Sequence, residues 1–134
     1  MRIAIARTLL EQIMAMAGAS AGVEICGLLF GRDGAVEAIG RADNVAPDPT
    51  RHFELDPAIL LAAHRQARGG GPMVLGHYHS HPSGRAEPSP TDAACAVADG
   101  SLWLIVGGGE ARLWQARAGA AGGVRFAEVA LDIR

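Results

Sequence analysis

The stretch from Met73 to Asp92 reads MVLGHYHSHPSGRAEPSPTD and carries the strongest structural and chemical signals in this chain. Its first part, Met73 to Tyr78, is typical of a buried strand. Alternate side chains of a strand point to the same face, so His77, His79 and His81 are expected to stand in one row. Any adjacent pair of these imidazoles could then bind the same ion. A lone histidine on a strand, by contrast, is rarely a metal ligand.

A carboxylate follows the histidines after the proline- and glycine-rich loop 82–88. Asp92 lies in a helix predicted from Thr91 to Ala98, and the loop would return it to the histidine row. Two imidazoles, one carboxylate and an open fourth position are the catalytic arrangement of zinc. Ser89 and Asp92 also have a purely structural explanation, because S-x-x-D with proline at the first helical position is a capping box.

The rest of the sequence alternates predicted strands and helices along the whole chain. Strands are expected at 2–5, 24–30, 35–41, 102–106, 112–115 and 124–133, and helices at 9–17 and from Asp56-Pro57 to the Gly69–Pro72 break. This interleaving favours an α/β or α+β architecture with a mixed central sheet and helices packed on its faces. At 134 residues, the chain is expected to form a single domain, 1–134.

Composition excludes several classes of function. A formal charge of −2 and the lack of a basic cluster argue against a nucleic-acid partner. The sequence has no apolar run long enough to span a membrane and no secretory signal. Cys26 and Cys95 lie far apart without a C-x-x-C pattern, so both are expected as free thiols in a cytoplasmic protein.

The motifs together resemble the JAMM (MPN-plus) metallopeptidase family, in its short bacterial form. The signature consists of an upstream glutamate, then H-x-H-P, a loop and S-x-x-D. It matches Glu24, the run His79 to Pro82, and the run Ser89 to Asp92, and Asp92 follows His81 by eleven positions, the spacing that the family uses. The segment 24–31 also resembles the family's E-x-x-G-L-L-x-G strand. The resemblance covers nearly the whole chain, including residues 52–57, whereas other metal motifs such as H-E-x-x-H are absent.

This resemblance implies a three-layer α/β/α fold, similar to the cytidine deaminase core, with a mixed central sheet. It implies one zinc ion per chain, held by His79, His81 and Asp92. Glu24 would act as general base and then general acid, and Ser89 would donate a hydrogen bond to the oxyanion. His77 matches no ligand position and is expected to be a packing residue.

The resemblance also implies the substrate class: a peptide-type bond at the C-terminal Gly-Gly tail of a small ubiquitin-like or sulfur-carrier protein. Such a tail would be held by main-chain hydrogen bonds along a strand edge. Arg85 in the loop 82–88 would either grip a substrate carboxylate or simply be solvated. The alternative to an enzyme is a non-catalytic MPN-type scaffold that binds a partner protein. Neither the oligomeric state nor the particular substrate follows from the sequence.

Overall fold

The computed structural model describes residues 1–20 and 22–134, and every helix and strand expected from the sequence is present there. In chain order the elements are β1 (Arg2–Ile5), α1 (Arg7–Ala19), β2 (Cys26–Arg32), β3 (Ala35–Ala42), α2 (Pro57–Arg68), β4 (Met73–His81), α3 (Pro90–Cys95), β5 (Leu102–Gly107), β6 (Glu110–Ala118) and β7 (Val124–Ile133). None of the described helices is long and apolar enough to cross a bilayer.

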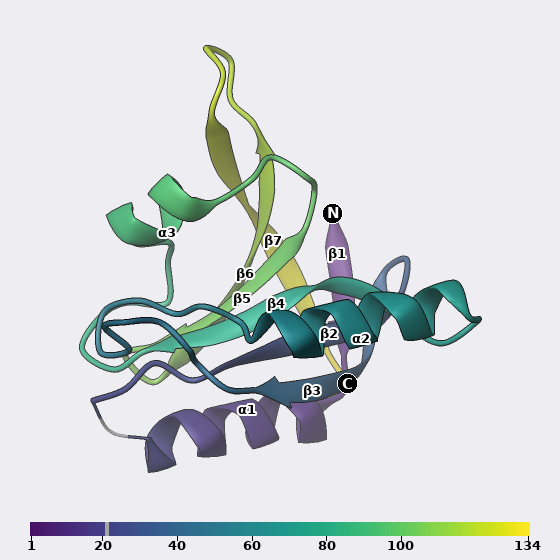
Figure 1. Ribbon diagram of the computed structural model, residues 1–134, viewed down its shortest axis with the longest axis horizontal. Coiled ribbons are helices and arrows are strands. Elements are labelled where there is room, and N and C mark those ends of the chain that lie inside the picture. The colour runs from purple at the N-terminus through teal and green to yellow at the C-terminus, as the bar shows by residue number, and fades with distance from the viewer. Residues whose placement is uncertain (21) are drawn as a thin grey trace.

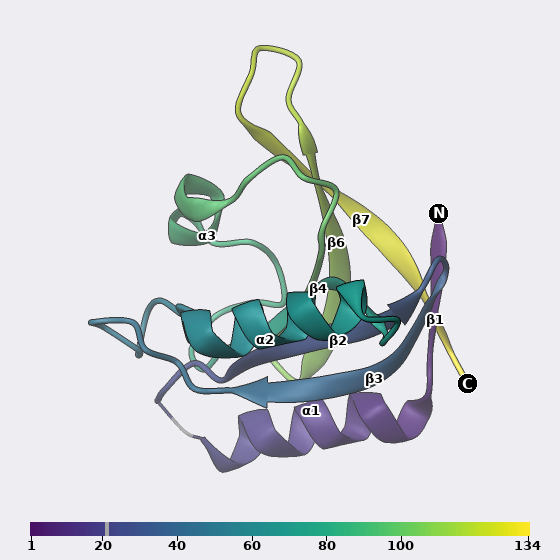
Figure 2. The same cartoon turned by 45° about the vertical axis from the view of Figure 1, so that its right-hand side comes forward.

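The strands form one mixed sheet in the order β1-β3-β2-β4-β5-β6-β7. Most neighbours are antiparallel, but β4 runs parallel to β5, and β1 runs parallel to both β3 and β7. Figures 1 and 2 show α1 and α2 on opposite sides of the part of the sheet that contains β2, β3 and β4. The prediction of an α/β fold with a mixed sheet and helices on both faces is therefore confirmed.

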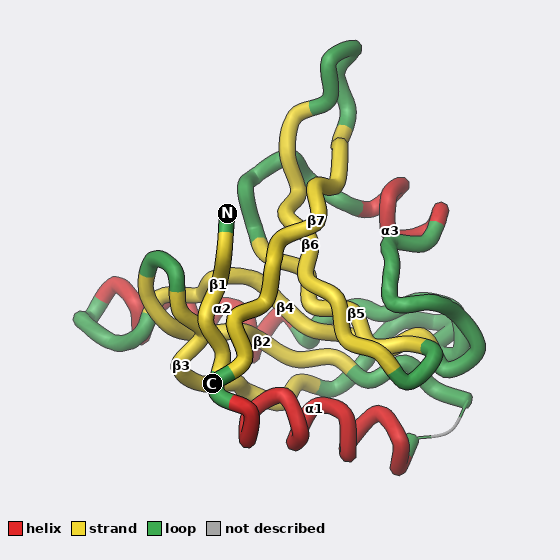
Figure 3. The backbone as a smooth tube through the Cα atoms, turned by 180° about the vertical axis from the view of Figure 1, so that it is seen from behind, coloured by secondary structure: helices red, strands yellow, loops and turns green. Residues whose placement is uncertain are grey.

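One feature of the sheet was not expected: it closes into a barrel. Closure occurs because the short strand β1 pairs with β7 along Arg2 to Ile5 and also with β3 at Ala4 and Ile5. Figure 3 shows this seam from behind, with β1 beside β7. Away from this seam, β4 lies in the middle of the strand order and is paired with β2 along one edge and with β5 along the other.

The pleat of β4 determines which side chains reach the candidate site. Tyr78 is fully buried in the larger core with Ile13 of α1 and Leu29 of β2. Its ring packs directly on Gly27, where an added Cβ would lie 2.3 Å from ring atoms of Tyr78. Because Tyr78 occupies this face, its neighbours His77 and His79 point to the opposite face.

Three element ends differ from the sequence-based expectation. β4 extends beyond Tyr78 to His81 because its last residues still pair with β5 and because the Ser80 N–H donates to the Ile25 carbonyl at 3.1 Å. α3 ends at Cys95, earlier than predicted, since Ala96 turns to an extended conformation and packs near Trp103. β2 begins at Cys26, which leaves Glu24 in the segment that precedes the strand.

Candidate metal centre

Three side chains predicted to bind a metal converge at the end of β4. His79 and His81 come from the strand, and Asp92 comes from the first turn of α3. The two Nε2 atoms lie 3.1 Å apart, and Asp92 Oδ2 lies 3.1 Å from His79 Nε2 and 3.0 Å from His81 Nε2. All three side chains are buried. The structure thus brings the three residues together as a compact triangle of nitrogen and oxygen atoms.

The donor chemistry of this triangle suits a cation. His81 Nδ1 lies 2.7 Å from the Arg85 carbonyl, an arrangement in which Nδ1 carries the proton and the Nε2 lone pair of a neutral ring faces the triangle. Asp92 also presents a lone pair there. A tetrahedral zinc ion with bonds of about 2.1 Å holds its ligand atoms about 3.4 Å apart, close to the observed spacing. A zinc ion therefore fits between these atoms with only small adjustments.

Asp92 is held as a carboxylate by the start of α3. The Ser89 N–H donates to Asp92 Oδ2 at 3.0 Å, and the Asp92 N–H donates to Ser89 Oγ at 3.0 Å, which completes the expected capping box. Burial alone would raise the pKa of Asp92, but the close contacts with His79 and His81 and the hydrogen bond from the Ser89 N–H outweigh it and lower that pKa. Since Ser89 Oγ accepts in the cap, its own proton stays free to donate.

The imidazoles differ in their preference for charge. Burial lowers the pKa of His79 and favours the neutral ring that a metal ligand requires, although Asp92 opposes this effect. Burial acts in the same direction on His81, but its contacts with Asp92 and with the Arg85 carbonyl outweigh burial and raise its pKa. In the absence of a metal, His81 therefore binds a proton more tightly than His79 does.

Glu24 lies across from the triangle with only 4% of its surface exposed. Its carboxylate, His79 and His81 each place one possible ligand atom within 4.8 Å of the others, so the two imidazoles could pair with either acid. Asp92 touches both rings, whereas Glu24 Oε1 has no hydrogen-bond partner among the described residues. Desolvation by burial, with smaller contributions from Asp92 and Asp48 against His81, raises the pKa of Glu24 to about 7. A carboxyl group with a pKa near neutral and a free oxygen is better suited to transferring a proton than to binding the metal.

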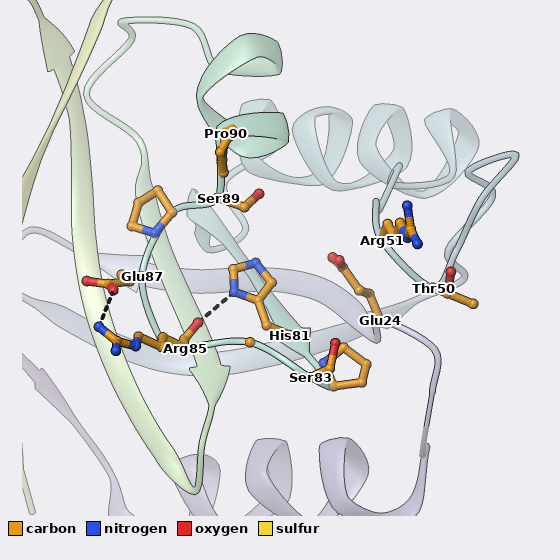
Figure 4. A pocket seen from close by; sticks show the side chains of 12 residues that line it. Glu24, Thr50, Arg51, His81, Ser83, Arg85, Glu87, Ser89 and Pro90 are labelled. Atoms are coloured by element: carbon orange, nitrogen blue, oxygen red, sulfur yellow. Dashed lines mark hydrogen bonds and ion pairs between the residues drawn. The ribbon is translucent and has the colours of Figure 1, made fainter.

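Glu24, His81 and Ser89 line an open pocket of about 380 Å³ (Figure 4). Arg51 stands on the wall formed by the segment before α2. Arg85 lies on the opposite side, but its side chain is 87% exposed, and its guanidinium group pairs with Glu87 at 3.7 Å and points away from the pocket. The solvated alternative for Arg85 is thus the one that its geometry favours.

His77 lies behind the triangle, outside this pocket. Its ring stacks on His79 with centroids 5.3 Å apart and meets Trp103 edge to face at 4.4 Å. Burial lowers the pKa of His77 well below its usual value, which keeps the ring neutral in this aromatic cluster. These contacts agree with a packing role.

The sequence assigned no role to two residues that lie close to the site, Asn44 and Phe53. Asn44 donates from Nδ2 to the carbonyl of Glu24 at 2.9 Å and to that of His52 at 3.0 Å. The Phe53 ring stacks on the His79 ring with centroids 4.2 Å apart and an interplanar angle of 20°. Both belong to the irregular segment between β3 and α2, which has no periodicity that would have singled them out.

Several known proteins are similar to this chain in sequence or in fold. A family described as prokaryotic homologues of the JAB domain matches residues 6–117. A desampylase from Haloferax volcanii is 37% identical over 84 residues, and a probable TtuB-protein conjugate cleaving protease from Thermus thermophilus is 41% identical over 86 residues. These matches span 61% and 64% of this chain but only 60% and 57% of the relatives' own lengths. A protein from Desulfitobacterium hafniense, solved in solution, superposes with a TM-score of 0.81 at 29% identity, covering 98% of this chain and 92% of that one.

Proposed function

The chain belongs to the family of prokaryotic JAB-domain homologues, the short JAMM type, and we propose that it is a zinc-dependent peptidase. The observation that carries the proposal is the convergence of His79, His81 and Asp92 beside the unpaired carboxyl group of Glu24. The proposal includes one zinc ion per chain, a single domain over 1–134 and a cytoplasmic location. The complete ligand set and the free Glu24 argue against a scaffold that only binds a partner.

A zinc ion held by His79, His81 and Asp92 would supply a Lewis acid that activates water and polarises the scissile carbonyl group. Glu24 would take the proton of the attacking water and later return it to the leaving amine. Its burial, which raises its pKa to about 7, fits a group that must act in both directions near neutral pH. The Ser89 hydroxyl would donate its free proton to the oxyanion that develops on the carbonyl oxygen.

The proposed substrate is the C-terminal Gly-Gly tail of a small ubiquitin-like or sulfur-carrier protein. The Thermus relative is named a probable TtuB-protein conjugate cleaving protease, and the Haloferax relative is named a desampylase. Main-chain hydrogen bonds along a strand edge would hold such a tail. β4 itself is paired with β2 and β5, so the tail would reach the site through the pocket between residues 50–51 and the loop 82–88. Glycines suit a pocket whose floor carries the reactive groups, since they present no side chain to its walls.

Intact-mass analysis tests this proposal. The zinc-loaded protein is incubated with a sulfur carrier that bears a few residues after Gly-Gly, and in parallel with Lys-linked diubiquitin. We expect the extended carrier to be trimmed to its Gly-Gly end, and the Glu24→Gln variant to serve as the inactive control. Cleavage of diubiquitin alone would contradict the substrate while supporting the peptidase. Absence of stoichiometric zinc and of any cleavage would favour the scaffold.

A further inference from the structure

The irregular segment 44–54, called the strap below, connects the two sides of the candidate metal centre. One side is Glu24, whose backbone N–H donates to the Pro49 carbonyl at 2.8 Å and whose own carbonyl accepts from Asn44. The other side is His79, which is covered by the Phe53 ring. A single stretch of chain thus touches both the candidate base and a candidate ligand.

Asn44 holds the strap in shape. Its Nδ2 donates to the carbonyls of Glu24 and His52, and its Oδ1 accepts from the N–H groups of Ala46 and Glu54, both at 3.1 Å. Two donors and two acceptor sites are the full capacity of an asparagine side chain, so the amide orientation is fully determined. The bonds to residues 52 and 54 flank Phe53 and fix the backbone from which its ring extends.

The His79 ring lacks the restraint that usually orients a ligating histidine. Such a residue commonly donates its second nitrogen to a carboxylate or carbonyl group. His79 Nδ1 is buried and has no partner in the described part of the chain. Its ring is instead enclosed by aromatic planes, with Phe53 stacked at 4.2 Å and His77 at 5.3 Å.

We propose that Phe53, held by Asn44, is a positioning residue that fixes the plane of the His79 imidazole through stacking. This inference rests on the proposed metal centre. The stack stops the ring from turning about its bond to Cβ and keeps Nε2 directed at the position between His81 and Asp92. The same strap fixes the backbone of Glu24, so the base and the ligand keep their relative placement.

Zinc affinity, measured by competition with a chromophoric chelator, tests the inference without relying on activity. Phe53→Met keeps an apolar side chain of similar volume but has no plane, and we expect affinity to fall about tenfold or more, as for loss of other groups that orient a ligand. Phe53→Tyr keeps the ring and is expected to stay within about twofold. Phe126→Met is the matched control. The Phe126 ring belongs to the same aromatic cluster, with its centroid 4.9 Å from that of Trp103, and the zinc affinity of this variant is expected to be unchanged.

The outcomes separate this inference from the proposed function. If the unmodified chain binds no zinc, the metal centre and the inference fall together. If the unmodified chain binds zinc and Phe53→Met binds it equally well, only the inference is overturned. The inference is also overturned if Phe126→Met weakens zinc binding as much as Phe53→Met does. The absorption spectrum of the cobalt-substituted protein provides a second signature, which should change for Phe53→Met but not for Phe53→Tyr. Should Phe53→Met fail to fold, Asn44→Asp removes both donated hydrogen bonds and is expected to weaken zinc binding by about the same factor, and unchanged affinity would overturn the inference.

Discussion

Replacing Glu24 by glutamine should separate metal binding from catalysis. The substitution preserves the shape of a side chain that is 4% exposed, so the surrounding packing is retained. It removes the only function that the proposal gives to Glu24, the transfer of a proton. General acid–base catalysis is typically worth a factor of 10² to 10⁴, which corresponds to about 3–5 kcal/mol in the activation free energy. Turnover should fall by that factor, while zinc content stays at one ion per chain.

The same variant should change the stability of the metal-free protein in a pH-dependent way. Glu24 has a pKa of about 7 in the folded chain and 4.5 as its ordinary value, mainly because burial penalises the charged form. The folded chain therefore binds this proton more tightly than the unfolded chain does. The free energy of unfolding accordingly falls as the pH rises from about 4.5 to about 7. This difference in pKa corresponds to at most about 3 kcal/mol, which solvent screening beside the open pocket reduces to about 1–2 kcal/mol. Glutamine cannot ionise and avoids this loss.

Urea unfolding of the EDTA-treated proteins at pH 4.5, 6 and 8 provides the assay. The Glu24→Gln variant and the parent should have similar free energies of unfolding at pH 4.5, and the variant should be more stable at pH 8. Glu11→Gln, which removes the same charge from an exposed position on α1, is the control and should show no such trend. A variant that is less stable than its parent at pH 8, or that retains near-normal turnover with zinc, would refute this account of Glu24.

The remaining predictions concern ligands, packing and capping. His81→Ala should lose its zinc in elemental analysis and its activity in the cleavage assay. His77→Phe should keep its zinc. Gly27→Ala should cost about 3 kcal/mol in urea unfolding, because the methyl group would overlap the buried ring packed on it, 2.3 Å away. Gly18→Ala, with open space around it in α1, should instead gain about 0.5–1 kcal/mol. Ser89→Ala removes the cap of α3 and should lower the stability measured in thermal melts by about 1 kcal/mol. It also removes the proposed oxyanion donor, so turnover should fall by a factor of about 10² to 10³.

Local chemistry explains why so much of the fold followed from the sequence. Asp56 caps α2 by accepting from the Ala58 N–H at 3.0 Å, as the Asp-Pro pair indicated. Gly34 adopts a φ of 84° in the turn between β2 and β3, as the Asp-Gly pair indicated. The alternation of histidines along β4 likewise placed His77 and His79 on one face. Each of these signals acts over two to four residues.

What the sequence could not provide depends on distant parts of the chain. The end of α3 at Cys95 was missed because the alanine-rich continuation has high helix propensity, and tertiary packing of Ala96 near Trp103 overrides it. Barrel closure depends on pairing between β1 and β7, which are separated by almost the whole chain. Asn44 acts through hydrogen bonds with residues up to 20 positions away, and no local pattern marks such an amide.

The seam between β1 and β7 also has a kinetic consequence. The pairing of Ile5 with Ile133 closes a very long loop, and contacts between residues so far apart in the chain slow folding. The seam should accordingly form last and open first, and backbone amides of β1 should exchange with solvent sooner than those of β4. In the strand order, β4 lies three strands from the seam in either direction. Opening of the barrel at this seam would therefore take place at the point of the circumference most remote from the histidines.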